Sequence, residues 1–180
     1  MAKHEAVAEQ NPMIIGQIAG VFDSLGDHER AHHWRTRFCE VTQNSAMAVI
    51  DHAHALVRQM RRTDEAEASL SRIGDNEQIA VAKLFVTYTR GLIALERGRH
   101  AEALAAFREA ETGSLEIQNP LMVGMRNDIR AFQAIALAGT GAREEARRLK
   151  VGVLPLLQAR NDRSLIQRLE SAVSSGLRDA

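Results

Sequence analysis

The sequence predicts an all-α protein, and three observations support that fold class. Apolar residues make up 45% of the 180 residues and aromatic residues only 4%, with alanine dominant, a composition that favours close-packed helices over sheets. No sustained alternation of apolar and polar residues is bounded by hairpin turns, so no β-strand is predicted. Small and apolar residues instead recur at offsets of three and four, which places them on one face of a helix.

The clearest of these segments begins at Gly91 and reads GLIALERGRHAEALAAFREA. It predicts two helices joined by a tight turn at 97–100. In the second helix, Ala103, Phe107 and Ala110 share one face because they are four and three residues apart. Gly91 lies where the two helices of a hairpin come closest. Small residues there allow the backbones to approach, and the Phe107 ring fills the space beside them.

This A-x3-F pattern, followed by another small residue, resembles the end of the tetratricopeptide repeat (TPR) signature. An alanine begins the same pattern in four predicted hairpins, at intervals near or above the ~34 residues usual for this repeat: Ala31, Ala66, Ala103 and Ala146. The resemblance covers nearly the whole chain and is weakest in the first hairpin, where Arg35 stands at the aromatic position. It implies antiparallel hairpins stacked as a right-handed superhelix. The alternative is a helical bundle with alanine-rich seams and no true repeat.

The predicted organisation is a flexible tail at 1–11 and a single TPR-like domain over 12–180. The tail is polar and lacks periodicity, as the first residues of many domains do. The domain consists of hairpins at about 12–42, 44–74, 77–113 and 120–151, followed by capping helices at 155–177. Gly152 and Pro155 are expected to break or kink the helix that precedes the cap. The last helix is amphipathic, which suits an element that covers the open end of a stack.

Charge and cysteine content exclude several classes of partner. Lys plus Arg equals Asp plus Glu, at 23 each, so no net charge draws the chain to nucleic acid or membrane. The single cysteine, Cys39, cannot form an internal disulfide, which fits a reducing cytoplasm. The apolar segment 13–22 is interrupted by Gln17 and too short to cross a bilayer. We therefore expect a cytoplasmic protein with no nucleic-acid or membrane partner.

One segment matches a catalytic motif. HERAH at 28–32 fits the HExxH signature of zinc hydrolases, with His28 and His32 on one helical face and Glu29 as the base. The G-x-x-H extension of that signature is absent, and His28 stands at the exposed start of its helix. We predict no bound metal, no cofactor and no enzyme activity, with a zinc-dependent hydrolase as the remote alternative.

Three other residues with reactive side chains are expected to have structural roles. His52 and His54 are two residues apart on a predicted helix, so their rings point about 200° apart and cannot share a metal. We expect one of them to pack within its hairpin and the other to face solvent. Cys39 is expected to be a buried small hydrophobic residue.

The TPR resemblance implies a non-catalytic module that binds a peptide or protein segment in a concave groove lined by the first helix of each hairpin. The predicted groove is polar in the N-terminal half, where the first two hairpins offer Gln17, Asp23, Asp51, Arg58 and Gln59. Of these, Asp51 and Arg58 are the predicted partner-binding residues. The groove is apolar in the C-terminal half, where the predicted binding residues are Tyr88, Leu92, Leu95, Phe132 and Ile135. Each apolar residue could instead belong to the core. The expected partner is another protein, a peptide or a second copy of the chain, and the alternative function is the sensor or oligomerisation domain of a larger regulator.

Overall fold

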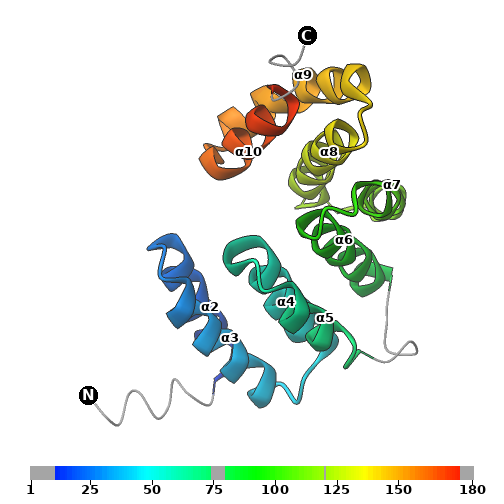
Figure 1. Ribbon diagram of the computed structural model, residues 1–180. Coiled ribbons are helices and arrows are strands. Elements are labelled where there is room, and N and C mark those ends of the chain that lie inside the picture. Colours follow the sequence, from blue (N-terminus) through cyan, green and yellow to red (C-terminus); the bar gives the residue numbers. More distant parts are fainter. Residues whose placement is uncertain (1–10, 74–79, 120, 175–180) are drawn as a thin grey trace. The chain divides into compact units, whose positions relative to one another are not determined.

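The computed structural model describes residues 11–73, 80–119 and 121–174, and all regular structure within them is helical (Figure 1). The all-α prediction is confirmed for this part of the chain. The tail predicted at 1–11, apart from its last residue, and the predicted start of the third hairpin lie outside the described residues. The helices are α2 (Pro12–Ser24), α3 (His28–Val41), α4 (Ala46–Met60), α5 (Thr63–Leu70), α6 (Ala80–Glu96), α7 (His100–Glu116), α8 (Leu121–Gly139), α9 (Arg143–Ala159) and α10 (Arg163–Ser174).

The chain divides into two compact units, residues 1–89 and 90–180, and the division falls inside α6. The first unit holds α2 to α5 and the N-terminal part of α6. The second holds the rest of α6 and α7 to α10. Within the units, α2 packs on α3, α4 on α5 and α8 on α9, while α3 also packs on α4. The single domain over 12–180 and the right-handed superhelix are not tested by this arrangement and stay predictions.

Short turns join the paired helices, and their backbone explains the residues found there. Gly26, Gly98 and Gly141 follow α2, α6 and α8 with φ of 75°, 72° and 85°, a left-handed conformation that costs glycine little. At the end of α4 the same conformation is taken by Arg61, with φ of 56°. Asp27 then caps α3, because its side chain accepts a hydrogen bond from the backbone N–H of Arg30.

The alanine positions that defined the hairpins are fully buried. Their predicted inward orientation is confirmed, because all four have an exposed fraction of 0%: Ala31, Ala66, Ala103 and Ala146. Gly91 and Phe107 also meet as predicted. A Cβ added to Gly91 would lie 2.7 Å from the Phe107 ring. At that distance the ring or the helix would have to move. The glycine therefore allows the ring to pack directly on the α6 backbone.

Helix α9 corrects one prediction, since it continues through Gly152 and Pro155 to Ala159. Of the two expectations for these positions, a break or a kink, the break is wrong, because the helix ends only at Ala159. Pro155 cannot donate a hydrogen bond to the carbonyl of Val151. Both residues are exposed, so water can satisfy that carbonyl. Val153 and Leu157 are buried and hold the helix in place on its other side.

The final helix packs as its sequence pattern indicated. Leu165, Leu169 and Val173 are buried, and α10 contacts both α8 and α9. Arg168 of the same helix forms an ion pair with Glu96 at 2.5 Å. The apolar face of α10 therefore covers the last hairpin of the second unit.

Candidate functional site

A buried arginine connects the first three helices of the first unit. Arg35 of α3 is only 9% exposed. Its Nε donates to Oδ2 of Asp51 on α4 at 2.9 Å, and its Nη2 donates to Oδ2 of Asp23 on α2. Burial lowers the pKa of the guanidinium, but the two carboxylates outweigh that effect and raise it. The arginine is therefore charged, and it fixes α2 and α4 on either side of α3.

The two carboxylates in this network differ in exposure. Asp23 is mostly enclosed, with a side chain 16% exposed. Burial would raise its pKa, yet the Arg35 guanidinium, Gln59 and His28 together hold the pKa below its ordinary value. The Asp51 side chain is 57% exposed. The network thus presents a surface carboxylate whose orientation is set by a buried cation.

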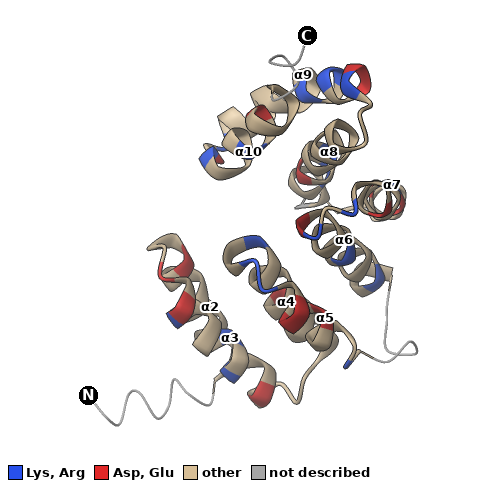
Figure 2. Ribbon diagram, in the orientation of Figure 1, with Lys and Arg blue, Asp and Glu red and all other residues tan. Residues whose placement is uncertain are grey.

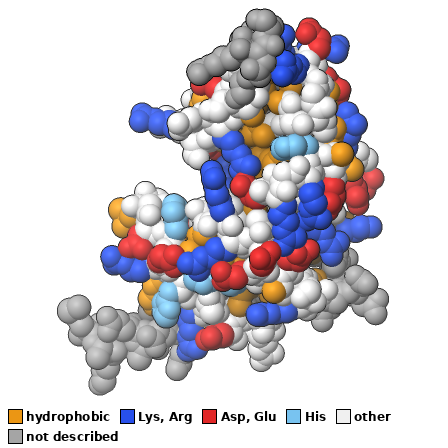
Figure 3. Space-filling model, in the orientation of Figure 1, with side chains coloured by type: hydrophobic (Ala, Val, Ile, Leu, Met, Phe, Trp, Pro, Cys, Tyr) orange, Lys and Arg blue, Asp and Glu red, His pale blue; other side chains and the backbone are white. Residues whose placement is uncertain are grey.

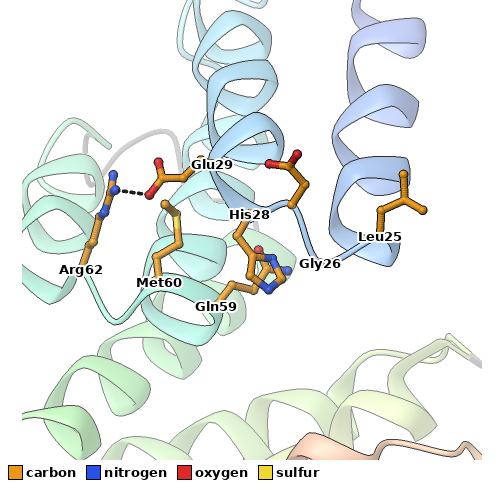
Figure 4. A pocket seen from close by; sticks show the side chains of 8 residues that line it. Leu25, Gly26, His28, Glu29, Gln59, Met60 and Arg62 are labelled. Carbon is orange, nitrogen blue, oxygen red and sulfur yellow. Dashed lines mark hydrogen bonds and ion pairs between the residues drawn. The ribbon is translucent and has the colours of Figure 1, made fainter.

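A pocket of about 640 Å³ lies beside this network, between the α2–α3 turn and the end of α4 (Figure 4). On one side of it, Nη2 of Arg62 donates to Oε1 of Glu29 at 2.6 Å. The His28 ring lies near the Gln59 side chain in the close view. The residues that line the pocket are Leu25, Gly26, Asp27, His28, Glu29, Gln59, Met60 and Arg62.

Asp23 connects the pocket to the buried arginine. Nδ1 of His28 lies 3.5 Å from Oδ1 of Asp23, and Gln59 is among the groups that lower the pKa of that carboxylate. An ionised carboxylate can only accept hydrogen bonds, so His28 donates to it. One pocket residue is consequently held by the same aspartate that pairs with Arg35.

The two histidines of HERAH contact different helices. His28 faces Asp23, whereas Nδ1 of His32 lies 3.0 Å from Nε2 of His52 on α4, and the rings of that pair stack at 4.9 Å. Among the described residues, no group of three or more His, Cys, Asp or Glu side chains is placed to hold a metal ion. These contacts tie the HERAH helix to α2 and α4.

His52 and His54 are both held inside the fold, so the expectation that one of them faces solvent is wrong. His52 is 9% exposed. His54 is half-buried, its Nδ1 is enclosed without a hydrogen-bond partner, and its ring lies 5.4 Å from that of Tyr88 on α6. Their two-residue spacing directs the rings to opposite sides of α4. Because α3 contacts one side of α4 and α6 the other, both directions lead into the interior.

The predicted groove residues separate into surface and core. Asp51 is exposed and Arg58 half-buried on α4. The apolar members are between 1% and 6% exposed, which makes them core residues that present no open apolar groove: Tyr88, Leu92, Leu95, Phe132 and Ile135. The physical reason is packing: Phe132, for example, stacks on Phe107 with ring centroids 5.8 Å apart. The candidate site is therefore the polar part of the first unit.

The substitution Tyr88→Ala is expected to destabilise the protein rather than to weaken binding alone. Removing a buried aromatic side chain costs about 3 kcal/mol, from lost apolar burial and the cavity left behind. Thermal unfolding followed by circular dichroism measures the loss. The exposed neighbour substitution Arg90→Ala serves as the control. A melting temperature unchanged in Tyr88→Ala would contradict the core assignment.

Asp23 is among the polar residues predicted for the N-terminal half of the groove, whereas the sequence did not indicate Arg35 as a member of the site. In the TPR resemblance, Arg35 is only a departure from the repeat's aromatic position. A signal was present, because a charged residue at a core position requires a partner, and the two flanking helices carry aspartates.

Comparison of the chain with protein-family models, with curated proteins and with solved structures found no match. No helix in the described ranges is long and apolar enough to cross a membrane.

Proposed function

We propose that the chain is a non-catalytic interaction module that binds a peptide or protein segment through its first unit. The observation that carries this proposal is the exposed Asp51 carboxylate, held by the buried guanidinium of Arg35. A buried arginine is expensive in desolvation and is rarely the most stable choice for a core position. It is useful where a charged group must be held in one orientation, because a preorganised group loses little entropy when it binds a ligand.

The spacing of charges on α4 indicates what such a segment would carry. Arg58 lies seven residues after Asp51, which corresponds to two helical turns and about 10 Å along one face. An extended peptide rises about 3.3 Å per residue, so residues about three apart in a ligand could reach both side chains. The proposed ligand is an extended segment with a basic residue opposite Asp51 and an acidic residue opposite Arg58.

The surrounding surface favours short-range recognition. Acidic and basic residues are mixed along the helices of each unit (Figure 2). They also lie next to one another on the face shown in the space-filling view (Figure 3). Neighbouring charges of opposite sign offset one another. Salt also screens the remaining field beyond about 10 Å at 0.1 M ionic strength. Binding would therefore depend on individual ion pairs and hydrogen bonds rather than on long-range attraction.

The substitutions Asp51→Asn and Arg58→Glu are expected to weaken binding of peptides selected on the wild-type protein from a random display library. We expect about a tenfold rise in Kd for each, with the difference shrinking at high salt, because an ion pair is lost or reversed. Fluorescence anisotropy at 0.05 M and 0.5 M salt measures both effects. Glu102→Lys, an exposed change in the second unit, is the matched control. Equal Kd values for wild type and both variants would contradict the proposal.

A further inference from the structure

The last helix rests on the second unit through one apolar face. Leu165, Leu169 and Val173 of α10 are spaced four residues apart, so they lie on one side of the helix, and they are 3%, 0% and 7% exposed. This face packs on α8 and α9. Helix α8 also packs on α7 and on α9 directly. Release of α10 would therefore uncover a face of α8 and α9 while these other helix contacts remain.

A cation completes the contact between α10 and the unit. Arg168 of α10 pairs with Oε1 of Glu96, the last residue of α6, at 2.5 Å, and its guanidinium lies over the Phe132 ring of α8, 5.5 Å from the ring centroid. The Glu96 side chain is only 11% exposed, so loss of its cation would leave a largely enclosed carboxylate without that charge partner. An aromatic face also attracts a cation. The surface beneath α10 thus accepts apolar side chains and one cation together.

The turn before α10 is fixed to α8 separately from the helix itself. Arg160 pairs with Asp128 of α8 and with Asp162 at 3.0 Å. Asp162 in turn accepts a hydrogen bond from the backbone N–H of Leu165 and so caps α10. The helix has 12 residues, a length at which isolated helices are only marginally stable in water. Its helical form therefore depends on docking, and the turn can stay in place when the helix leaves.

We propose that the surface beneath α10 is a docking site for an amphipathic helix of a partner protein, which α10 keeps closed by occupying it within the same chain. The helix already seated there defines the chemistry of the partner: apolar residues at positions i, i+4 and i+8 and an arginine at i+3, as at Leu165, Leu169, Val173 and Arg168. An apolar helix face seated on such a surface is a common mode of recognition. The tether gives α10 a high effective concentration, so a partner binds in competition with it.

The probe is a fluorescein-labelled peptide with the sequence of residues 163–174. We expect weak binding to the wild-type protein, because its own α10 occupies the site. Leu169→Asp in the full chain places a charge at a 0% exposed position of α10 and releases the helix. This variant should bind the peptide at least about tenfold more tightly than wild type in fluorescence anisotropy. Glu170→Gln, an exposed change on the same helix, is the matched control and should behave as wild type. Equal affinity of wild type and Leu169→Asp would overturn the proposal.

Two changes in the peptide test the chemistry of the site. A peptide carrying Arg168→Gln lacks the cation for Glu96 and Phe132, and its Kd for the Leu169→Asp protein should rise about tenfold. A peptide carrying Leu169→Asp lacks the central apolar anchor and should not bind. If either altered peptide binds as tightly as the original, the described surface does not hold it, and the proposal is wrong.

A second variant covers the case in which Leu169→Asp disrupts more than α10. Arg168→Gln in the full chain removes only the ion pair with Glu96, and it too should bind the original peptide more tightly than wild type does. Circular dichroism melts should keep a cooperative transition in both variants. Unfolding of the whole second unit in both variants would make α10 an indispensable part of the fold and overturn the proposal. Asp51→Asn should leave binding of this peptide unchanged, which separates this site from the function proposed for the first unit.

Discussion

Acidification from pH 7 to pH 4 is expected to destabilise the first unit by about 3 kcal/mol for each of two histidines. Burial lowers the pKa of His52 and of His54 from 6.5 to about 4. Well above pH 6.5 both side chains are neutral in the folded and unfolded chains, so the full stability is present. Between pH 6.5 and about 4, only the unfolded chain takes up these protons, and stability is lost as the pH falls.

The neighbours of the two histidines reinforce this behaviour. After burial, His32, Arg35 and Arg72 lower the pKa of His52. Protonation of both His32 and His52 would also remove the acceptor from their 3.0 Å contact. His54 is affected by Arg58 in the same direction, and Asp51 only partly offsets it. Both effects act on α4, which contacts α3 and α5.

The acid sensitivity of the histidines is distinguishable from that of Asp23. The pKa of Asp23 is below its ordinary value of 3.8. Its contribution is therefore present above that value and is lost only at lower pH. Urea unfolding between pH 4.5 and 7.5, followed by circular dichroism, should show a plateau near pH 7.5. Below pH 6.5, stability should fall by up to about 1.4 kcal/mol per pH unit for each histidine. His54→Gln should remove about half of the slope. A flat profile over this range would contradict the burial of both rings.

The fold was predictable from the sequence to the extent that local rules decide it. Helical periodicity and turn glycines depend on residues close together in the chain. They correctly placed Ala31 and Ala146 at buried positions and Gly98 in a turn. The same rules failed at Pro155, because the exposure that allows the helix to continue is a tertiary property. Local rules also do not determine whether an apolar helix face is covered by another helix. Tyr88 could therefore be assigned from sequence either to the groove or to the core, and its burial assigns it to the core.

The candidate site depends on contacts between helices, which periodicity does not specify. Asp23 and Asp51 are 12 and 16 residues from Arg35, and they meet it only because α2 and α4 both approach α3. The predicted polar character of Asp51 and Arg58 followed from their residue types alone. Their relation to Arg35, to the His32–His52 pair and to the pocket required the packing of four helices in space.

The substitution Ala103→Glu is expected to destabilise the second unit by about 5 kcal/mol or more. Ala103 is 0% exposed, on the face of α7 where Phe107 packs against Gly91 of α6. A glutamate there would add four heavy atoms beyond Cβ to a close helix contact and bury a carboxylate without a partner. Changes of this size arise from few mechanisms, of which a buried unpaired charge is one.

The matched control for this experiment is Ala105→Glu, two residues away on the exposed face of the same helix. It introduces the same side chain with the same helix propensity, so it should cost less than about 1 kcal/mol. Thermal and urea unfolding of both variants, followed by circular dichroism, gives the two free energies directly. Because the only difference is the helical face, a large gap between the variants measures the register of the α6–α7 hairpin. If the two midpoints shift equally, Ala103 does not face α6, and the assignment of the alanine positions to the hairpin contact is wrong.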